Sequence, residues 1–223
     1  MGRVEEIIRR EEQALRDKQP RSIAYRAEAS RHLPGGVSST WQTAPPHPIY
    51  VTHGKGSKIY DLDGNEYVDY HLGYGVMVVG HAHPKVVEAV QRRVALGSHF
   101  AQPTEEATTV AEELARRFRL PLWRFGNSGT EATLDAVRLM RAATGRDLVI
   151  KVEGTYHGHH DSLMVSVVPD PELIGPRDRP VPVPQTRGLP RAFVDLVRVV
   201  PFNDVEAVEA GVRRGGSRGG SPG

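Results

Sequence analysis

The stretch Arg124-Phe-Gly-Asn-Ser-Gly-Thr-Glu-Ala-Thr133 decides how the chain is expected to fold. An apolar run over residues 120–125 predicts a strand that leads into it, and the pattern over residues 131–143 predicts a helix that leads out. The first N–H groups of a helix have no partner within the helix and lie at the positive end of its dipole, which suits a phosphate. Gly129 lets the backbone approach an anion closely, and Thr130 adds a hydroxyl donor. The same pattern is also typical of an ordinary strand–turn–helix with a Ser or Thr N-cap.

Working outward, strands alternate with helices after residue 84, which predicts an α/β layer with a largely parallel sheet. The predicted helices are 84–96, 104–117 and 131–143, with a last one starting near residue 205, and the predicted strands are 120–125, 147–152 and 197–200. Residues 169–191 form a long Pro-rich loop of the kind that serves as a lid, a binding loop or a disordered connection.

Before residue 72 the pattern is different. Helices are predicted over residues 4–18 and 22–32, an irregular loop over 37–48, and a small antiparallel sheet from strands 49–53, 58–62 and 66–70. We therefore expect an N-terminal α+β lobe over 1–72, a large domain over 73–211 and a disordered Gly/Ser/Arg tail over 212–223. The abrupt loss of pattern at the tail predicts a truncated or frame-shifted chain.

Composition narrows the class of protein. The 223 residues include 29 basic and 27 acidic side chains, too balanced to indicate a nucleic-acid binder. There is no cysteine, hence no disulfide framework, thiolate metal site or cysteine nucleophile. No apolar run reaches membrane-spanning length, and the densely charged N-terminus is unlike a secretory signal. We expect a cytoplasmic protein that binds neither nucleic acid nor membrane.

Five motifs in this order and spacing resemble the class III pyridoxal-phosphate-dependent aminotransferase family, and within it the aminomutase branch. They are Leu33-Pro-Gly-Gly-Val-Ser38, Tyr60-Asp-Leu-Asp-Gly-Asn-Glu-Tyr-Val-Asp69, Gly80-His-Ala-His-Pro84, Asn127-Ser-Gly-Thr-Glu-Ala132 and Glu153-Gly-Thr-Tyr-His-Gly158. The resemblance covers the family's N-terminal half. It implies a fold-type I enzyme whose three-layer α/β/α large domain is incomplete here.

The resemblance also implies a ligand, pyridoxal 5'-phosphate. In such enzymes the Ser-Gly-Thr turn, here Ser128, Gly129 and Thr130, holds the cofactor phosphate. The aromatic ring of Tyr156 would lie over the pyridine ring, where a flat apolar face excludes water, and His157 would support the site. From its residues alone, Tyr156 is more consistent with a core aromatic at a strand end, because buried Tyr with a satisfied hydroxyl is common.

The expected substrate is a small amino acid or amine. In the aminomutases of this family, a Ser and an Arg shortly after Pro-Gly-Gly-Val hold the substrate carboxylate. The Ser maps to Ser39, but the Arg position falls on Gln42, an uncharged amide that cannot form a bidentate charge-assisted clamp. The Trp of the family's Gly-Ser-Trp-Gly maps to Tyr74. These differences also allow a related aminotransferase acting on another amino acid or amine.

The family's chemistry needs a lysine whose amine forms a Schiff base with the cofactor. In the family this lysine, and the acid opposite the pyridine nitrogen, lie in the second half. None of the five lysines here, Lys18, Lys55, Lys58, Lys85 and Lys151, matches the catalytic position. We therefore expect no catalytic residue in this chain, and no aminotransferase or aminomutase activity from the chain alone.

Two other functions fit parts of the pattern. Imidazole and carboxylate groups suit zinc, and such groups cluster in His157, His159, His160 and Asp161, with His81 and His83 elsewhere. However, the run lacks the i, i+4 spacing of a zinc helix, so we expect no metal. A non-catalytic phosphate-binding or dimerisation module is the other alternative, because the family builds its site at a homodimer interface.

Overall fold

The computed structural model describes residues 2–216, and their side chains through residue 213. The chain packs as two compact units, Met1–Pro103 and Thr104–Gly223, which are described separately below. Residues 73–103, which the sequence suggested would join the large domain, pack within the first unit. The division of the whole protein into domains stays a prediction. Within the described residues, no helix is both long and apolar enough to cross a membrane.

The first unit begins with two helices, α1 (Arg3–Lys18) and α2 (Pro20–Ala29). Acidic Glu5 and Glu6 occupy the first turn of α1 and basic Arg16 and Lys18 its last turn, which favours this helix through its dipole. Proline at the first position of α2 fits a helix start because its missing N–H would have no partner there. Two short 3-10 turns, η1 (Pro34–Gly36) and η2 (Thr40–Gln42), follow in and beside the segment expected to be irregular.

A three-stranded antiparallel sheet follows, as predicted. Its strands are β1 (Val51–Lys55), β2 (Lys58–Asp61) and β3 (Glu66–Val68), in the order β1-β2-β3. Gly54 pairs with Ile59 across the first hairpin, and Ile59 pairs with Tyr67 across the second. Gly56 and Gly64 turn the hairpins with positive φ angles, which glycine adopts without steric cost.

A buried polar network joins the helices to this sheet. Gln19, fully buried, donates from Nε2 to the Tyr67 hydroxyl at 2.7 Å and accepts at Oε1 from His47 at 2.6 Å. The Tyr67 hydroxyl in turn donates to Asp61 at 2.8 Å. These hydrogen bonds tie the helices to the sheet, although the Nδ1 of His47 is buried without a hydrogen-bond partner in the described residues.

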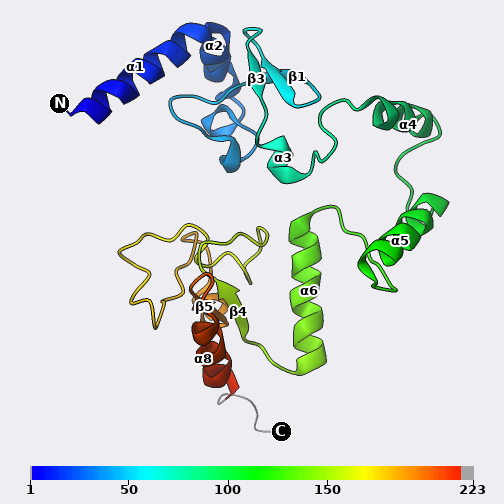
Figure 1. Cartoon of the computed structure of the whole chain (residues 1–223), viewed down its shortest axis with the longest axis vertical. Helices are drawn as coiled ribbons and strands as arrows, with labels where there is room; N and C mark the ends of the chain where they lie inside the picture. Colours follow the sequence, from blue (N-terminus) through cyan, green and yellow to red (C-terminus); the bar gives the residue numbers. More distant parts are fainter. Residues whose placement is uncertain (1, 217–223) are drawn as a thin grey trace. The chain divides into compact units, whose positions relative to one another are not determined.

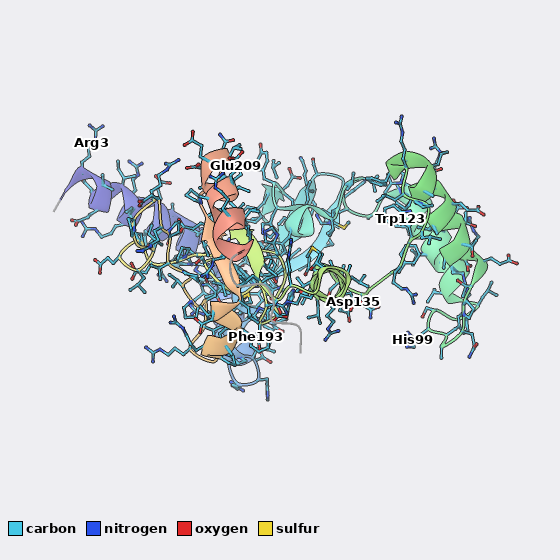
Figure 2. The ribbon with its side chains drawn as sticks, turned by 90° about the horizontal axis from the view of Figure 1, so that it is seen from below. Arg3, His99, Trp123, Asp135, Phe193 and Glu209 are labelled. Atoms are coloured by element: carbon cyan, nitrogen blue, oxygen red, sulfur yellow. The ribbon has the colours of Figure 1, made fainter. Side chains whose placement is uncertain are left out.

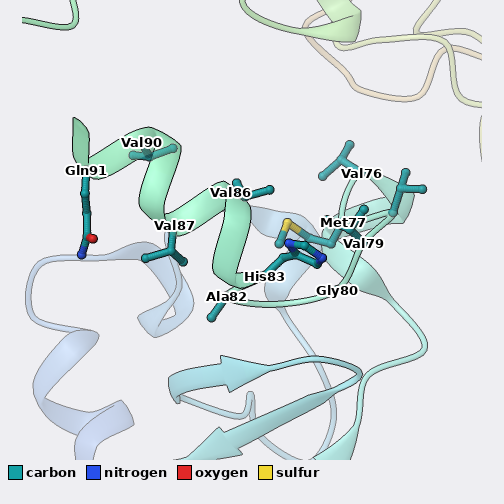
Figure 3. Close-up of a pocket in the computed structure, with 11 residues that line it drawn as sticks. Val76, Met77, Val79, Gly80, Ala82, His83, Val86, Val87, Val90 and Gln91 are labelled. Carbon is teal, nitrogen blue, oxygen red and sulfur yellow. The ribbon is translucent and has the colours of Figure 1, made fainter. Parts of the chain in front are cut away.

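The end of the first unit is a loop and two helices, α3 (Leu72–Gly75) and α4 (Pro84–Val94). His81 packs against Gly54, where a Cβ would lie 2.6 Å from the His81 ring, and its Nε2 pairs with Asp69 at 2.6 Å. An apolar hollow lies between this loop and α4 and is shown in Figure 3; it is lined mainly by Val76, Met77, Val79, Val86, Val87 and Val90.

The second unit contains α5 (Glu105–Phe118), α6 (Gly129–Thr144), β4 (Val149–Val152), α7 (Arg191–Asp195), β5 (Val197–Val200) and α8 (Val205–Gly216) (Figure 1). Strands β4 and β5 pair in parallel, with Val149 opposite Val197, as the alternation of strands and helices predicts. Helix α8 packs on both strands (Figure 1), and a Cβ at Gly211 would touch Val200 and Ile150.

The core of this unit lies beside the parallel pair. It comprises five buried side chains, Val165, Leu189, Val194, Val197 and Val199. The ring of Phe193 on α7, labelled in Figure 2, packs partly buried against them.

Two expectations for this unit were wrong in part. Residues 120–125 do not form a strand, because a strand requires a pairing partner and the described residues place none beside this segment. The expected disordered tail over 212–223 also starts too early, since residues 212–216 continue α8. Residues 217–223, the rest of that tail, lie outside the described part of the chain.

Candidate functional site

The turn before α6 has the geometry that the sequence predicts. Ser128 is the N-cap residue, with extended backbone angles, and its Oγ accepts a hydrogen bond from Glu131 N at 3.2 Å. The Glu131 carboxylate reaches back and accepts from the N–H groups of Asn127 and Ser128. This reciprocal capping box fixes the start of the helix. Gly145, left-handed at φ 64°, ends it.

The capping box leaves four donors unused at the helix start. Within residues 2–216, no protein group accepts a hydrogen bond from the N–H groups of Gly129 and Thr130, or from the hydroxyls of Ser128 and Thr130. Each of the two hydroxyl oxygens accepts a bond, so each proton remains available. A Cβ built on Gly129 meets no heavy atom within 4 Å. The first turn of α6 is therefore an open cradle of unused donors that suits an anion.

The loop after β4 packs against this same turn. Thr133 Oγ1 lies 2.6 Å from the carbonyl oxygen of His157, and His159 N donates to Thr130 Oγ1 at 2.9 Å. Gly158 is buried at φ 112°, where a Cβ would lie 2.9 Å from the Thr130 Cα. The structure thus brings the second predicted motif, Glu153 to Gly158, onto the first turn of α6.

Tyr156 and His157 lie within that loop. The Tyr156 side chain is 47% exposed, so it is not the core aromatic that was the alternative interpretation. His157 is also exposed and touches α6 through its backbone carbonyl. The cofactor-binding residues suggested by the sequence therefore occur in one unit, around one helix start.

The histidine run does not form a metal centre in the described part of the chain, where no group of three or more His, Cys, Asp or Glu side chains could hold a metal ion. His160 instead lies against Thr133, with 3.2 Å between Nε2 and Oγ1. Burial lowers the pKa of His160, and the charges of Arg138 and Arg141 lower it further against the opposing effect of Asp161. His160 therefore packs against α6 through Thr133.

Lys151 on β4 is the buried lysine of this unit. Only 2% of the residue is exposed, and its ammonium donates to the carbonyl oxygens of Thr155 and Ser166 at 2.6 Å and 3.3 Å. Burial lowers the pKa of Lys151 to about 8, with the charge of Glu153 opposing. Lys151 contacts the chain's own backbone and is enclosed by it.

The predicted substrate residues lie together in the first unit. Gln42 Oε1 accepts from the backbone N–H groups of Ser38 and Ser39 at 3.1 and 3.2 Å. The Tyr74 hydroxyl donates to the carbonyl oxygen of Trp41 at 3.1 Å, and the Tyr74 backbone is left-handed at φ 63°. These residues form one local cluster.

Sequence reasoning missed the contacts of three residues in this part of the structure: Thr133, Lys151 and Ser166. Thr133 could have been found because it lies three residues after Thr130, and residues three apart on a helix share one face. A lysine within an apolar strand was the signal for Lys151. Nothing local marks Ser166, because its contacts come from segments distant in sequence.

The chain is similar in sequence to known proteins. The model of the family described as aminotransferase class-III matches residues 39–178. Glutamate-1-semialdehyde 2,1-aminomutase of Methanopyrus kandleri is 41% identical over 199 residues, which cover 89% of this chain and 45% of that protein. The chain thus spans less than half the length of this relative.

Solved structures of transaminases and aminomutases are also similar to this chain. An omega-transaminase from Sphaerobacter thermophilus superposes with a TM-score of 0.82 at 39% identity, covering 87% of this chain and 44% of that one. A glutamate-1-semialdehyde-aminomutase from Pseudomonas aeruginosa superposes with a TM-score of 0.81 at 36% identity. The match covers 95% of this chain and 46% of that one. A variant of that enzyme is known in complex with PMP.

These neighbours confirm the predicted fold class, a partial fold-type I α/β architecture. With more than half of its residues matched by one family model, the chain belongs to the class-III aminotransferases.

Proposed function

We propose that this chain is the phosphate-binding part of a pyridoxal-phosphate-dependent aminotransferase or aminomutase. The observation that carries the proposal is the set of four unused donors of Ser128, Gly129 and Thr130 at an accessible helix start. A phosphate monoester carries close to two negative charges and three acceptor oxygens, which these donors and the helix dipole match.

The residues around the cradle fit the rest of the cofactor. The open space at Gly129 leaves room for a phosphate to approach the backbone. Tyr156, 47% exposed, lies on the loop that packs on the cradle. In this role Tyr156 covers one face of the pyridine ring and excludes water from it, and His157 anchors the loop to α6 through its carbonyl.

Bound pyridoxal phosphate supplies an electron sink for loss of a proton from the substrate's amino-bearing carbon. The described residues of this chain bind and orient it. The covalent attachment needs a lysine that can reach the cofactor. Lys151 is enclosed by carbonyl oxygens, and none of the other four lysines, Lys18, Lys55, Lys58 and Lys85, matches the family's catalytic position. We propose that the chain by itself binds the cofactor without performing amino transfer.

The substrate in this proposal is a small amino acid or amine, and the complete enzyme is a cytoplasmic homodimer. The capping role of Gln42 supports a substrate pocket different from that of the aminomutases. Its amide oxygen is occupied by the N–H groups of Ser38 and Ser39, and its side chain carries no positive charge for a carboxylate.

Calorimetric titration of the purified chain with pyridoxamine 5'-phosphate tests the proposal. This form of the cofactor has an amine in place of the aldehyde, so it cannot react with surface lysines. Saturable 1:1 binding is expected. No binding by a folded chain would contradict the proposal, and heat released equally by inorganic phosphate would reduce the site to a general anion site.

A further inference from the structure

The ammonium of Lys151 is surrounded by backbone oxygens from two segments. It donates to Thr155 O at 2.6 Å, to Val152 O at 3.2 Å and to Ser166 O at 3.3 Å, with the Thr155 hydroxyl at 3.4 Å. An ammonium has three protons, so the three carbonyls account for all of them. The Thr155 hydroxyl donates to Val152 O at 2.6 Å. A charged donor therefore closes the turn that follows β4.

Ser166 links this turn to the long Pro-rich loop. Its carbonyl oxygen accepts from Gly154 N at 3.0 Å as well as from Lys151. Its N–H donates to Val183 O at 2.7 Å, and its Oγ accepts from Val183 N at 3.0 Å. Ser166 is fully buried and left-handed at φ 48°, a conformation that a non-glycine residue adopts only when its surroundings impose it.

The opposite end of the same loop is fixed to α6. There Thr133 Oγ1 bonds His157 O, and His159 N bonds Thr130 Oγ1. The segment from Gly154 to His159 is thus held at both ends, by Lys151 and Ser166 on one side and by α6 on the other. Tyr156 lies between the two attachments with 47% of its surface exposed.

We propose that Lys151 is a positioning residue, which together with Ser166 sets the place of the Tyr156–His157 loop against the phosphate cradle. The consequence for the cofactor rests on the proposed function, but the positioning itself does not. Lys151 does not act as the covalent lysine, because its nitrogen is enclosed by the three carbonyls. The bonds from Ser166 to Val183 connect the loop's position to the long segment over residues 169–190.

Hydrogen exchange of the full chain, read by mass spectrometry, tests the positioning without any cofactor. In Lys151→Met the side chain stays unbranched, is one heavy atom shorter and loses all donors. We expect the amides of Gly154 and His159 to exchange at least about tenfold faster, as loss of a charge-assisted hydrogen bond predicts. The amides in the middle of α6 should exchange as in the wild type. Lys55→Met, at an exposed lysine, is the charge-matched control and should change neither segment.

A second variant keeps the test decisive if Lys151→Met does not fold. Lys151→Gln retains a neutral donor and should give an intermediate exchange rate over residues 154–159. Unchanged exchange there in folded variants would overturn the proposal. So would a uniform increase across α6 and β5 in both variants, since Lys151 would then be a general core residue.

Pyridoxamine 5'-phosphate binding separates this inference from the proposed function. If positioning matters for the cofactor, Lys151→Met should bind it at least about fivefold more weakly than the wild type, while Lys55→Met binds as the wild type does. If Lys151→Met binds pyridoxamine 5'-phosphate as tightly as the wild type although its loop exchanges faster, the positioning by Lys151 does not affect cofactor binding, and that part of the inference is overturned. Failure of the wild type to bind would refute the proposed function, and the exchange result would still decide the role of Lys151.

Discussion

The hydroxyl of Thr133 lies 2.6 Å from the carbonyl oxygen of His157, and this contact joins two motifs 24 residues apart. One motif supplies the donors of the helix start, and the other supplies an exposed aromatic side chain. Because the contact is to a backbone carbonyl, it fixes the loop whatever side chain occupies position 157. The cradle is therefore the product of two segments that pack on each other.

Thr133→Val tests this contact. Valine keeps the shape of threonine and removes the hydroxyl, so we expect a loss of about 1 kcal/mol in the free energy of unfolding and weaker binding of pyridoxamine 5'-phosphate. Thr133→Ser, which keeps the hydroxyl, should bind nearly as the wild type does. Thr144→Val is the matched control, since the Thr144 hydroxyl bonds Met140 O at the far end of the same helix. Equal affinity of the 133 and 144 valine variants would contradict the account.

Gly129→Ala and Gly158→Ala should separate binding from stability. A Cβ at Gly129 meets no atom within 4 Å, and alanine favours helix, so stability should be unchanged or rise by up to about 1 kcal/mol. Its methyl group would nevertheless occupy space beside the unused N–H groups, so anion affinity should fall.

A Cβ at Gly158 would lie 2.9 Å from the Thr130 Cα, and Gly158 has φ 112°. Gly158→Ala should therefore lower the free energy of unfolding by more than about 1 kcal/mol. Urea unfolding and calorimetric titration measure the two effects, and the reverse ranking in stability would be incompatible with the structure.

The burial of Lys151 predicts a pH dependence of stability. Burial lowers its pKa from the ordinary value of 10.5 to about 8 in the folded chain, so between these values the unfolded state binds more protons. Stability contributed by this group therefore rises with pH over that window, and below about pH 8 the unfavourable burial of charge is fully present. Urea midpoints of the wild type relative to Lys151→Met, measured from pH 7.5 to 10.5, should increase with pH. A flat difference would show that the ammonium keeps its ordinary pKa.

Gln42 is expected to act as a cap in the first unit. Gln42→Ala removes the acceptor for the N–H groups of Ser38 and Ser39 and should cost about 0.5–2 kcal/mol of stability. Gln42→Glu keeps an acceptor at the same position and should retain most of that stability. Thermal unfolding followed by circular dichroism would distinguish them, and equal stability of the alanine and wild-type chains would rule out the capping role.

Local rules predicted much of this structure. Ser128, Glu131 and Gly145 mark the ends of α6 in sequence, because capping depends on neighbours three or four residues away. The hairpins around Gly56 and Gly64 follow from turn chemistry in the same way. The strand predicted for residues 120–125 failed because apolar character does not supply a pairing partner.

The supports of the site were harder to predict. Lys151 was predicted to lie within an apolar strand and not to match the catalytic position, but its contact with the carbonyl of Ser166, 15 residues away, has no local signal. The contact between Thr133 and His157 likewise depends on how the loop returns to the helix. Such contacts are set by tertiary packing, which periodicity and composition do not encode.

The central claim is that the four donors at the start of α6 recognise a phosphate. The most direct measurement is the affinity ratio between pyridoxamine 5'-phosphate and pyridoxamine, which differ only in that group, for the wild type and for Thr130→Val. For the wild type we predict at least about tenfold preference for the phosphorylated form, and for Thr130→Val a markedly smaller preference. Equal affinity of the wild type for both compounds, or a preference that Thr130→Val leaves unchanged, would contradict the account.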